Sequence, residues 1–539
     1  RTIDNVKMGY IFEELIRKFS ENAEAGDHYT GRDIIKLMVN ILLAEGCDDI
    51  FDDGKVITIL DQACGTGGML STGYNFIKRY NPSADVRLFG QEINPESYAM
   101  CLAEMLIKGQ NAENICYQDT MKADRFKGTK MRFVLENPPF GTAWGGKDAA
   151  EGVEDAVNAE YQKGFDGRWG AGLPGSGDMQ MLFLQSAIDK MDDNFGRAAI
   201  IENGSPLFSG GTASGESQIR RWMLESDLIE AIIALPADLF YNTGIATYIW
   251  VLSKNKRPER KGKIQLIDAS TFFKKLRKAL GDKKNEISPE DRSAVTKLYA
   301  DFTENEYCKI YRNEEFIYRE YTVMQPLQRS YAITEERIQA MVGKGALDSL
   351  YNEVKFADLE LMEERDGKAQ KQLNKFFAGK PIYDAILADL NHAISDTVWM
   401  SPDAFMPHLT EVLSKATTDK KLLEKIADGL SVMDKNAEIQ RDRKGNIIYD
   451  KETKDTELVK WEESIEDYMA REVLPHIPDA AAFFEENLSA KKPVIKTGAE
   501  IPFTRYFYKY QQPTASEELE TKFSELELSV SERVAKLFE

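Results

Sequence analysis

The sequence predicts a doubly wound α/β domain followed by a mainly helical region, and three observations support this fold class. Between Val56 and about Asp268, short apolar runs rich in branched residues alternate with helical stretches, as parallel strands joined by crossover helices require. The runs are almost continuously apolar, which is typical of strands that helices cover on both faces. A glycine-rich turn follows the first run, at the position where such sheets bind ligands.

The predicted strands can be placed in chain order. They are VITILD (56–61), RLFGQEI (87–93), NICYQDT (114–120), RFVLENPPF (132–140), RAAIIEN (197–203), LIEAIIALP (228–236), ATYIWVLSK (246–254) and KIQLID (263–268). The helix after the second strand has clear ends, because Asn94 can cap it, Pro95 suits its first position and Gly109 can end it. Helices are also expected at 4–19 and 31–45.

Behind the last strand the composition changes. From about residue 334 the chain is helical, charged and poor in strand signals, and the polar stretch 434–458 is expected to be a loop. The last predicted helix, 516–538, carries an apolar seam at alternating steps of four and three residues. The seam consists of Leu519, Phe523, Leu526, Val530, Val534 and Leu537. The aromatic cluster Phe503, Tyr506, Phe507, Tyr508 and Tyr510 is expected to be core or interface.

Composition restricts the class of protein. A chain of 539 residues with 42% hydrophobic and 29% charged residues is expected to form two or three globular domains. No apolar run approaches the roughly 20 residues that span a bilayer. No signal peptide is visible, so a cytoplasmic protein is expected, although the chain opens with Arg1 rather than Met. The five cysteines and four histidines show no disulfide or metal-ligand spacing, so no metal site is expected.

The formal net charge of −20 bears on any nucleic-acid partner. Affinity for duplex DNA comes largely from Lys and Arg side chains that neutralise phosphates. Either the chain does not touch nucleic acid, or a partner chain supplies most of the contact. Two basic runs, 254–263 and 274–284, are candidates for contact with the DNA backbone, with solvated loops as the alternative.

The turn after the first strand, DQACGTGG (61–68), lets the backbone approach a ligand closely. Leu70 stands where the dinucleotide fingerprint G-x-G-x-x-G needs Gly or Ala, which disfavours a dinucleotide. Glu92 ends the second strand, where an acid can accept hydrogen bonds from ribose hydroxyls, and Gln118-Asp119 ends the third, where it suits an adenine amino group. Each acid alone could merely cap a helix, but three polar strand ends in chain order favour a nucleoside ligand.

The fourth strand ends in Asn137-Pro138-Pro139-Phe140-Gly141. The prolines stop the strand and stiffen the backbone, which aims the Asn137 side-chain oxygen and the Pro138 carbonyl into the cleft. Two such acceptors can bind both hydrogens of an exocyclic amine and free its lone pair for in-line attack on a sulfonium methyl. Phe140 would stack on a base that has left the duplex. The alternative is a rigid turn without a chemical role.

These motifs together resemble a known family. D-x-A-C-G-T-G-G followed about 70 residues later by N-P-P-F resembles the amino-methylating DNA methyltransferases of the gamma arrangement, and GDHYTGR (26–32) resembles their segment beside the cofactor. Four further segments resemble the modification subunits of Type I restriction–modification systems, so that the resemblance covers nearly the whole chain. They are NGSPLF (203–208), SGESQIRRW (214–222), LPADLFYNTGIATYIW (235–250) and EIPFTRYFY (500–508).

The resemblance implies a mixed sheet like that of SAM-dependent methyltransferases and an N6-adenine DNA methyltransferase activity that uses S-adenosyl-L-methionine. Catalysis is assigned to Asn137, Pro138, Pro139 and Phe140. The residues expected at the cofactor are Asp27, His28, Tyr29, Thr30, Gly31, Arg32, Asp61, Gly65, Thr66, Gly67, Gly68, Glu92 and Asp119. The expected domains are a remnant of an N-terminal helical region (1–25), the catalytic domain (26–270), a basic and helical connection (271–333) and a mainly helical partner-binding domain (334–539).

The sequence departs from the family pattern at three positions. Gly31 and Gln62 stand where proline is usual, and Glu136 stands before N-P-P-F where a small residue is common. Residues 1–25 are expected to be only a remnant of the family's N-terminal helical domain. These departures put cofactor affinity and rate in question, and leave the reaction class as it is.

The resemblance also accounts for the acidity. In Type I systems a separate specificity subunit reads the DNA sequence and two modification subunits clasp the double-stranded DNA, so that the contacts are divided between chains; a restriction subunit can accompany them. The C-terminal helical domain, including the seam of 516–538, is expected to dock on the helical spacers of the specificity subunit, with an intramolecular packing helix as the alternative. The Gly-rich stretch 164–177, with Phe165 and Trp169, is expected to be a flap over the target base.

Three other functions remain to be distinguished. The same pair of acceptors could hold the amine of cytosine, which would give N4-cytosine methylation. The chain could also be a SAM-binding scaffold without activity, or, more remotely, a dehydrogenase. Methylation at cytosine C5 is disfavoured, because it needs a cysteine nucleophile and the sequence has no Pro-Cys. The recognition sequence is expected to lie in another polypeptide.

Overall fold

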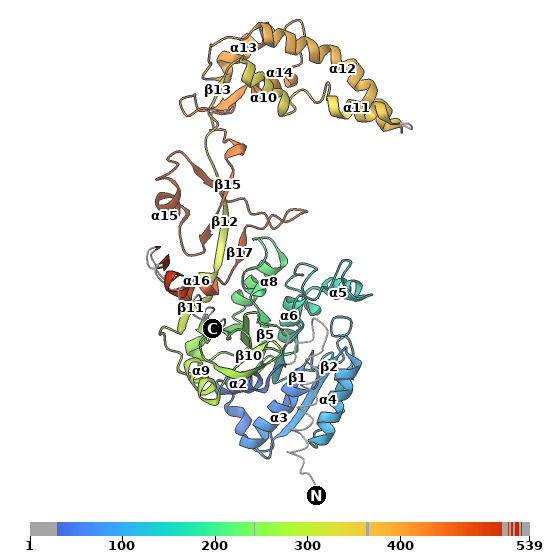
Figure 1. The fold of residues 1–539 in the computed structure, drawn as a ribbon, viewed down its shortest axis with the longest axis vertical. Coiled ribbons are helices and arrows are strands. Elements are labelled where there is room, and N and C mark those ends of the chain that lie inside the picture. The colour runs from blue at the N-terminus through green and yellow to red at the C-terminus, as the bar shows by residue number, and fades with distance from the viewer. Residues whose placement is uncertain are drawn as a thin grey trace, which may run out of the picture. The chain divides into compact units, whose positions relative to one another are not determined.

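The computed structural model describes residues 30–241, 243–362 and 366–508, together with 516, 519–520, 523–527 and 530 of the C-terminal stretch. The predicted helix 4–19 and three predicted cofactor residues, Asp27, His28 and Tyr29, lie outside the described residues. The chain divides into two compact units (Figure 1). The first contains residues 1–319, 460–462 and 486–539, and the second contains 320–459 and 463–485.

The first unit is built on a nine-stranded sheet in the order β11-β8-β6-β7-β5-β4-β1-β2-β3. The strands are β1 (Val56–Asp61), β2 (Asp85–Glu92), β3 (Ile115–Tyr117), β4 (Phe133–Glu136), β5 (Arg197–Asn203), β6 (Ile229–Ala234), β7 (Thr247–Ser253), β8 (Lys263–Asp268) and β11 (Cys308–Arg312). The central strands are parallel, whereas β7 is antiparallel to β5 and β6, and β11 is antiparallel to β8. The predicted doubly wound mixed sheet is therefore confirmed, with all eight predicted strands in it.

Helices cover both faces of this sheet (Figure 1), which explains why its strands are apolar at nearly every position. One face packs against α2 (Arg32–Ala44), α3 (Gly68–Tyr80), α4 (Pro95–Ile107) and α9 (Pro289–Asp301). The other packs against α6 (Gln180–Lys190), α7 (Ser205–Phe208) and α8 (Gly215–Glu225). A further helix, α5 (Val153–Tyr161), belongs to a smaller core beside the sheet.

The predicted ends of α4 are confirmed. The Asn94 side chain accepts hydrogen bonds from the N–H groups of Glu96 and Ser97 at 2.9 and 3.0 Å, and Pro95 opens the helix. Gly109 follows the last turn with a φ of +67°, a conformation that glycine adopts at low cost. Helix α2 also starts and ends within one residue of its prediction.

The structure differs from the sequence prediction at 271–333, which was expected to be a basic and helical connection. It contains the hairpin β9 (Lys274–Leu280) and β10 (Lys283–Glu286), helix α9, the sheet strand β11 and the start of β12 (Ile317–Met324). Only α9 is an α-helix within these described residues. Charge hides the strand pattern, since Lys283 and Asn285 are the buried alternate positions of β10.

The second unit is helical from α10 onwards and ends in short strands. Its helices are α10 (Glu335–Gly343), α11 (Glu353–Leu361), α12 (Gly367–His392), α13 (Pro402–Val412), α14 (Lys420–Gly429) and α15 (Ile465–Tyr468). Its remaining strands are β13 (Arg329–Tyr331), β14 (Ser431–Met433), β15 (Asp455–Lys460) and β16 (Ala481–Phe483). Among the described residues, no helix is long and apolar enough to cross a membrane.

Candidate active site

Four neighbouring strands of the main sheet end in polar residues at one edge. The strands lie in the order β4, β1, β2, β3 and are parallel, so their carboxyl ends coincide. Asp61 ends β1, Glu92 ends β2, Asp119 follows β3 and Asn137 follows β4. The structure thus brings the expected cofactor acids and the expected catalytic asparagine to the same edge.

The glycine turn between β1 and α3 has the backbone that its sequence suggests. Gly65 and Gly67 have φ angles of +50° and +82°, which favour glycine. A Cβ atom at Gly67 would lie 2.7 Å from Cys101 Sγ, whereas one at Gly65 would meet nothing within 4 Å. The turn is therefore packed tightly on its inner side and open at Gly65. Leu70 is fully buried, so it is a core residue and not part of a dinucleotide fingerprint.

The acids at this edge hold the turn in place. Glu92 accepts hydrogen bonds from the N–H of Gly65 and the N–H of Asn94, both at 2.7 Å, and so connects the turn to the start of α4. Asp61 is 2% exposed and accepts from the N–H of Ala63 at 3.0 Å. Burial raises the pKa of Asp61 to about 8, with a further contribution from the charge of Glu92. Asp119 is half-buried and accepts from a backbone N–H at 2.8 Å.

The Asn-Pro-Pro-Phe motif leaves the sheet directly after Glu136. The Asn137 side chain is half-buried, and its Nδ2 donates to Thr30 Oγ1 at 2.8 Å. Phe140 is 9% exposed and packs edge-to-face against Phe240, with ring centroids 6.4 Å apart at 89°. The sequence analysis did not single out Phe240, although it lies in LPADLFYNTGIATYIW, one of the segments that carry the family resemblance.

A buried polar layer lies beneath this motif. Glu136 is 0% exposed and accepts from the N–H of Gln62 at 3.3 Å, and Glu202 on β5 is also 0% exposed. Within the described part of the chain, Oε2 of Glu136 and both carboxyl oxygens of Glu202 have no hydrogen-bond partner. Burial raises the pKa of both carboxyls well above the usual range, helped by Asp61 near Glu136 and by Asp178 near Glu202.

This layer gives a physical account of two departures from the family pattern. The environment of Glu136 favours its neutral form. Glu136 therefore adds an uncharged carboxylic acid beneath the site, and no negative charge beside the base pocket. Gln62, at the usual proline position, donates its N–H to that acid, which a proline could not do. Glu202 was missed in the sequence analysis; its only signal was an acid within an apolar strand.

The third departure, Gly31, is explained by an ion pair. Asp33 in the first turn of α2 accepts from Lys283 Nζ on β10 at 3.0 Å and from the N–H of Ile287 at 2.9 Å. A Cβ atom at Gly31 would lie 2.5 Å from Asp33 Oδ1 and 3.0 Å from Lys283 Nζ. Glycine therefore leaves room for this pair. Arg32, also expected at the cofactor, lies 3.8 Å from Glu104 of α4 in an ion pair.

The middle of the stretch 164–177, which was predicted to be a flap over the target base, is anchored in the core by Arg168 and Trp169. Trp169 is fully buried and its Nε1 donates to the Leu182 carbonyl at 3.1 Å. The Arg168 guanidinium donates to the carbonyls of Thr120 and Met121 at 2.6 and 3.2 Å. Phe165 is 71% exposed, with its ring centroid 5.9 Å from that of Trp222, and residues 175–177 are exposed as well.

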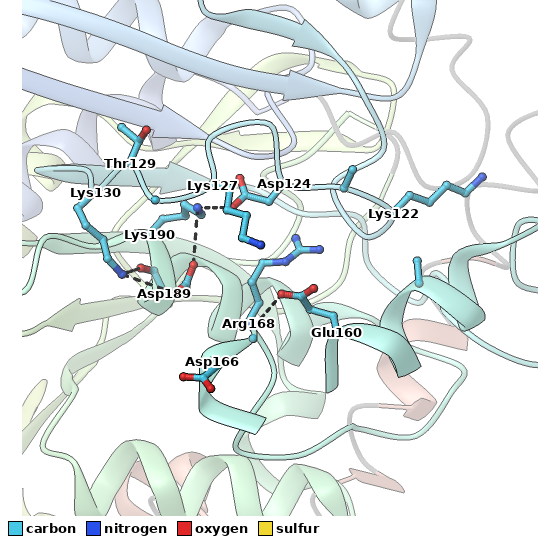
Figure 2. Close-up of a pocket in the computed structure, with 14 residues that line it drawn as sticks. Lys122, Asp124, Lys127, Thr129, Lys130, Glu160, Asp166, Arg168, Asp189 and Lys190 are labelled. Carbon is cyan, nitrogen blue, oxygen red and sulfur yellow. Dashed lines mark hydrogen bonds and ion pairs between the residues drawn. The ribbon is translucent and has the colours of Figure 1, made fainter. Parts of the chain in front are cut away.

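A cavity of about 220 Å³ lies between the loop 122–130, α5 and the end of α6. Figure 2 shows its acidic and basic side chains facing one another: Lys190 pairs with Asp124 and Asp189, and Lys130 pairs with Asp189. Of the described residues that line it, none is among the expected cofactor or catalytic residues. Its cations are largely compensated, and we assign it no role in the site.

Arg220 on α8 connects three of the segments that carry the Type I resemblance. Its guanidinium is buried and donates to the carbonyls of Ala499, Pro206 and Ser209 at 2.8, 3.1 and 2.8 Å. It thereby joins SGESQIRRW, the end of NGSPLF and β17 (Thr497–Ala499), just ahead of EIPFTRYFY. Arg220 therefore holds segments almost 300 residues apart in the chain against one another.

The aromatic cluster of α16 (Phe503–Phe507) packs as core, as predicted. Phe503 is 4% exposed and packs against Tyr248 with ring centroids 5.2 Å apart. Tyr506 packs against Tyr311 at 4.3 Å. Tyr508 is exposed and Tyr510 lies outside the described residues.

The fold and the polar carboxyl edge define a doubly wound α/β protein with its polar strand ends gathered beside the Asn-Pro-Pro-Phe motif, and known proteins share this fold. Residues 4–337 match the N-6 DNA Methylase family, and the chain belongs to that family. The methylase subunit of the type I restriction enzyme HindI from Haemophilus influenzae is 29% identical over 267 residues, which are 49% of this chain and 54% of that protein. The MjaVII methylase subunit from Methanocaldococcus jannaschii is 30% identical over 276 residues, 51% and 44% of the two chains.

Among solved structures, a type I restriction-modification system methyltransferase subunit from Streptococcus thermophilus is 27% identical. It aligns with a TM-score of 0.48 over 57% of this chain and 61% of its own. The chain spans about half the length of the curated relatives that it matches.

Proposed function

We propose that this protein transfers a methyl group from S-adenosyl-L-methionine to N6 of adenine in duplex DNA, as the modification subunit of a Type I restriction–modification complex. The observation that carries the proposal is the placement of Asn137-Pro138-Pro139-Phe140 at the end of β4, directly beside the glycine turn that ends β1. Membership of the N-6 DNA Methylase family supports the choice of N6.

The residues of the motif act on the target amine by position and electrostatics. The side-chain oxygen of Asn137 and the main-chain carbonyl of Pro138 accept its two hydrogens, which draws the nitrogen towards tetrahedral geometry and exposes its lone pair. The proline ring fixes the backbone, so these acceptors need no reorganisation during the reaction. The Phe140 ring, supported edge-on by Phe240, stacks on the face of the extruded base.

The residues at the carboxyl edge fit the proposed cofactor. The cofactor supplies an electrophilic sulfonium methyl group when bound. Glu92 and Asp119 place acceptors at the ends of two adjacent strands, suited to ribose hydroxyls and to an adenine amino group. The open side of Gly65 allows close approach to the backbone.

The first experiment identifies the product. Unmethylated genomic DNA is incubated with S-adenosyl-L-methionine and the complex of this chain with the specificity subunit encoded beside it, then digested to nucleosides for mass spectrometry. We expect N6-methyladenine. N4-methylcytosine without N6-methyladenine would assign the chain to the alternative reaction.

Asn137→Ala separates an enzyme from a scaffold. Loss of an acceptor that acts in the transition state should lower the transfer rate at least a hundredfold, while cofactor binding measured by calorimetry stays within threefold. If the wild-type complex also transfers no methyl group but binds the cofactor, the scaffold interpretation holds instead.

The proposed partners are duplex DNA, the specificity subunit, a second copy of this chain and, where one is encoded, a restriction subunit. A complex that acts on chromosomal DNA in this way would be cytoplasmic.

The exposed C-terminal seam supports docking on the specificity subunit. Its described members, Leu519, Phe523, Leu526 and Val530, are 52–69% exposed, which disfavours the alternative of intramolecular packing. Deletion of 514–539 should abolish co-purification with the specificity subunit and leave the α/β unit folded by circular dichroism; retained association would refute this role.

A further inference from the structure

We propose that Thr30 is a positioning residue that sets the rotation of the Asn137 side-chain amide; this inference rests on the proposed function, because it concerns how Asn137 meets the target amine. Nδ2 of Asn137 donates to Thr30 Oγ1 at 2.8 Å, although the two residues are 107 positions apart. Thr30 is only 9% exposed, so water cannot readily replace its hydroxyl as the partner.

The two ends of an asparagine amide have opposite hydrogen-bonding character. Its oxygen accepts and its nitrogen donates, so only the oxygen can receive a hydrogen of the target amine. A half-turn about the last side-chain bond would point an NH₂ group at another NH₂ group, and both would lose their partner. The motif therefore needs a group that holds the nitrogen end away from the base.

Thr30 selects the productive rotation of the Asn137 amide once the target amine is bound. A threonine hydroxyl can donate or accept, so in the free protein it could pair with either end of the amide. The amine engages the oxygen of Asn137, and Oγ1 of Thr30 is then the acceptor that satisfies the amide nitrogen. With the amine bound, the rotation that points the Asn137 oxygen at the amine and its nitrogen at Thr30 pairs both ends of the amide. The opposite rotation points the amide nitrogen at the amine, leaves both of these groups without a partner and is therefore less stable.

The position of Thr30 is fixed by the elements that follow it. Gly31 is the N-cap of α2, and the first helical turn is tied to the β9–β10 hairpin through Asp33 and Lys283. Lys283 also donates to the Leu239 carbonyl at 3.0 Å, and Ile34 beside Asp33 is fully buried. A hydroxyl mounted on so well-packed a helix start can hold an amide within the narrow geometry that catalysis requires.

This role makes a different prediction from the one that the family resemblance implies. A residue that contacts the cofactor should affect cofactor affinity when it is changed. A residue that orients Asn137 should affect the rate of transfer and leave that affinity nearly the same. The two roles can therefore be separated by measuring both quantities on the same variants.

The test compares Thr30→Val, which keeps the shape and removes the acceptor, with Thr30→Ser, which keeps the hydroxyl. Thr322→Val is the matched control, since Thr322 is also 9% exposed and belongs to the second unit. Each variant is purified as the full complex with the specificity subunit. Single-turnover methyl transfer to duplex DNA, the dissociation constant for S-adenosyl-L-methionine and the melting temperature are then measured.

We expect Thr30→Val to slow transfer at least tenfold with the cofactor dissociation constant within twofold, and Thr30→Ser to recover most of that loss. A Thr30→Val rate equal to the control, or a loss confined to cofactor affinity, overturns the inference. Thr30→Ala, which adds no bulk, replaces Thr30→Val if the latter does not fold and carries the same expectation. Absence of transfer by the wild-type complex would refute the proposed function instead, which keeps the two failures distinct.

Discussion

Asp61 ends β1 inside the protein, where the charged form of a carboxyl is disfavoured. Its pKa of about 8 in the folded protein lies well above the ordinary value of 3.8 that applies to the unfolded chain. Between these two values the folded protein holds a proton that the unfolded chain has released. The free energy of unfolding should therefore fall as the pH rises from about 4 to 8, by up to about 1.4 kcal/mol per pH unit from this group.

Asp61→Asn should remove that dependence, because the amide keeps the acceptor for the Ala63 N–H and cannot ionise. Melting temperatures of variant and wild type are compared from pH 5 to pH 8. The melting temperature of Asp61→Asn should rise relative to that of the wild type as the pH rises. Asp85→Asn, an exposed change at the start of β2, serves as the control. A difference between Asp61→Asn and wild type that does not vary with pH would contradict the buried neutral carboxyl.

At the scale of elements, β5, β6 and α9 are joined by a buried ionic cluster at the amino edge of the sheet. Arg197 at the start of β5 pairs with Glu230 on β6 at 2.9 and 3.2 Å and donates to the Tyr299 hydroxyl of α9 at 2.7 Å. Burial alone would raise the pKa of Glu230, but Arg197 and the Tyr299 hydroxyl hold it below the usual range. The cluster lies at the edge opposite to Asn137, so its role is in stability.

Glu230→Gln should lower the free energy of unfolding by about 3–5 kcal/mol, because it leaves the buried Arg197 without its anion. Glu225→Gln breaks the partly exposed pair of α8 with Arg221 and should cost less than about 1 kcal/mol. Urea unfolding of both variants provides the comparison. Equal, small losses would show that Arg197 finds other compensation.

The positions of strands along the chain and the ends of helices follow from sequence patterns, whereas the order of the strands in the sheet and the long-range contacts do not. Most of the eight predicted strands were recognised because burial on both faces leaves them nearly continuously apolar, whereas β2 and the edge strand β3 are partly exposed. The β9–β10 hairpin was missed because its buried positions, Lys283 and Asn285, are polar, and Lys283 is satisfied by Asp33, 250 residues away. The bond between Thr30 and Asn137 is hidden for the same reason, although each residue was predicted separately to belong to the site.

At the scale of the whole molecule, the net charge is −20, but two segments, 254–263 and 274–284, are locally basic. Most cations of the run 254–263, a candidate for contact with the DNA backbone, are used internally at the amino edge of the sheet, which disfavours that role, although Lys261 is exposed. Lys256 pairs with Asp227, Arg257 with Glu45, and Arg260 is buried. Strand β9 differs, since it exposes cations on both of its faces. It follows the carboxyl end of β8, at the edge that carries the proposed catalytic motif.

Because the cations of β9 are exposed, we expect them to contact the phosphates of duplex DNA. Neutralising Lys275, Arg277 and Lys278 of β9 with glutamine should weaken duplex binding by the complex. Each phosphate contact contributes about 0.9 to the slope of log affinity against log salt concentration, so the slope should fall by about two to three. The control replaces Arg79, Arg87 and Lys127, which are exposed outside both basic runs on the first unit, and should leave the slope as in wild type. Equal slopes for the two triple variants would assign the DNA backbone contacts to the other chains, as the overall acidity of this chain alone would suggest.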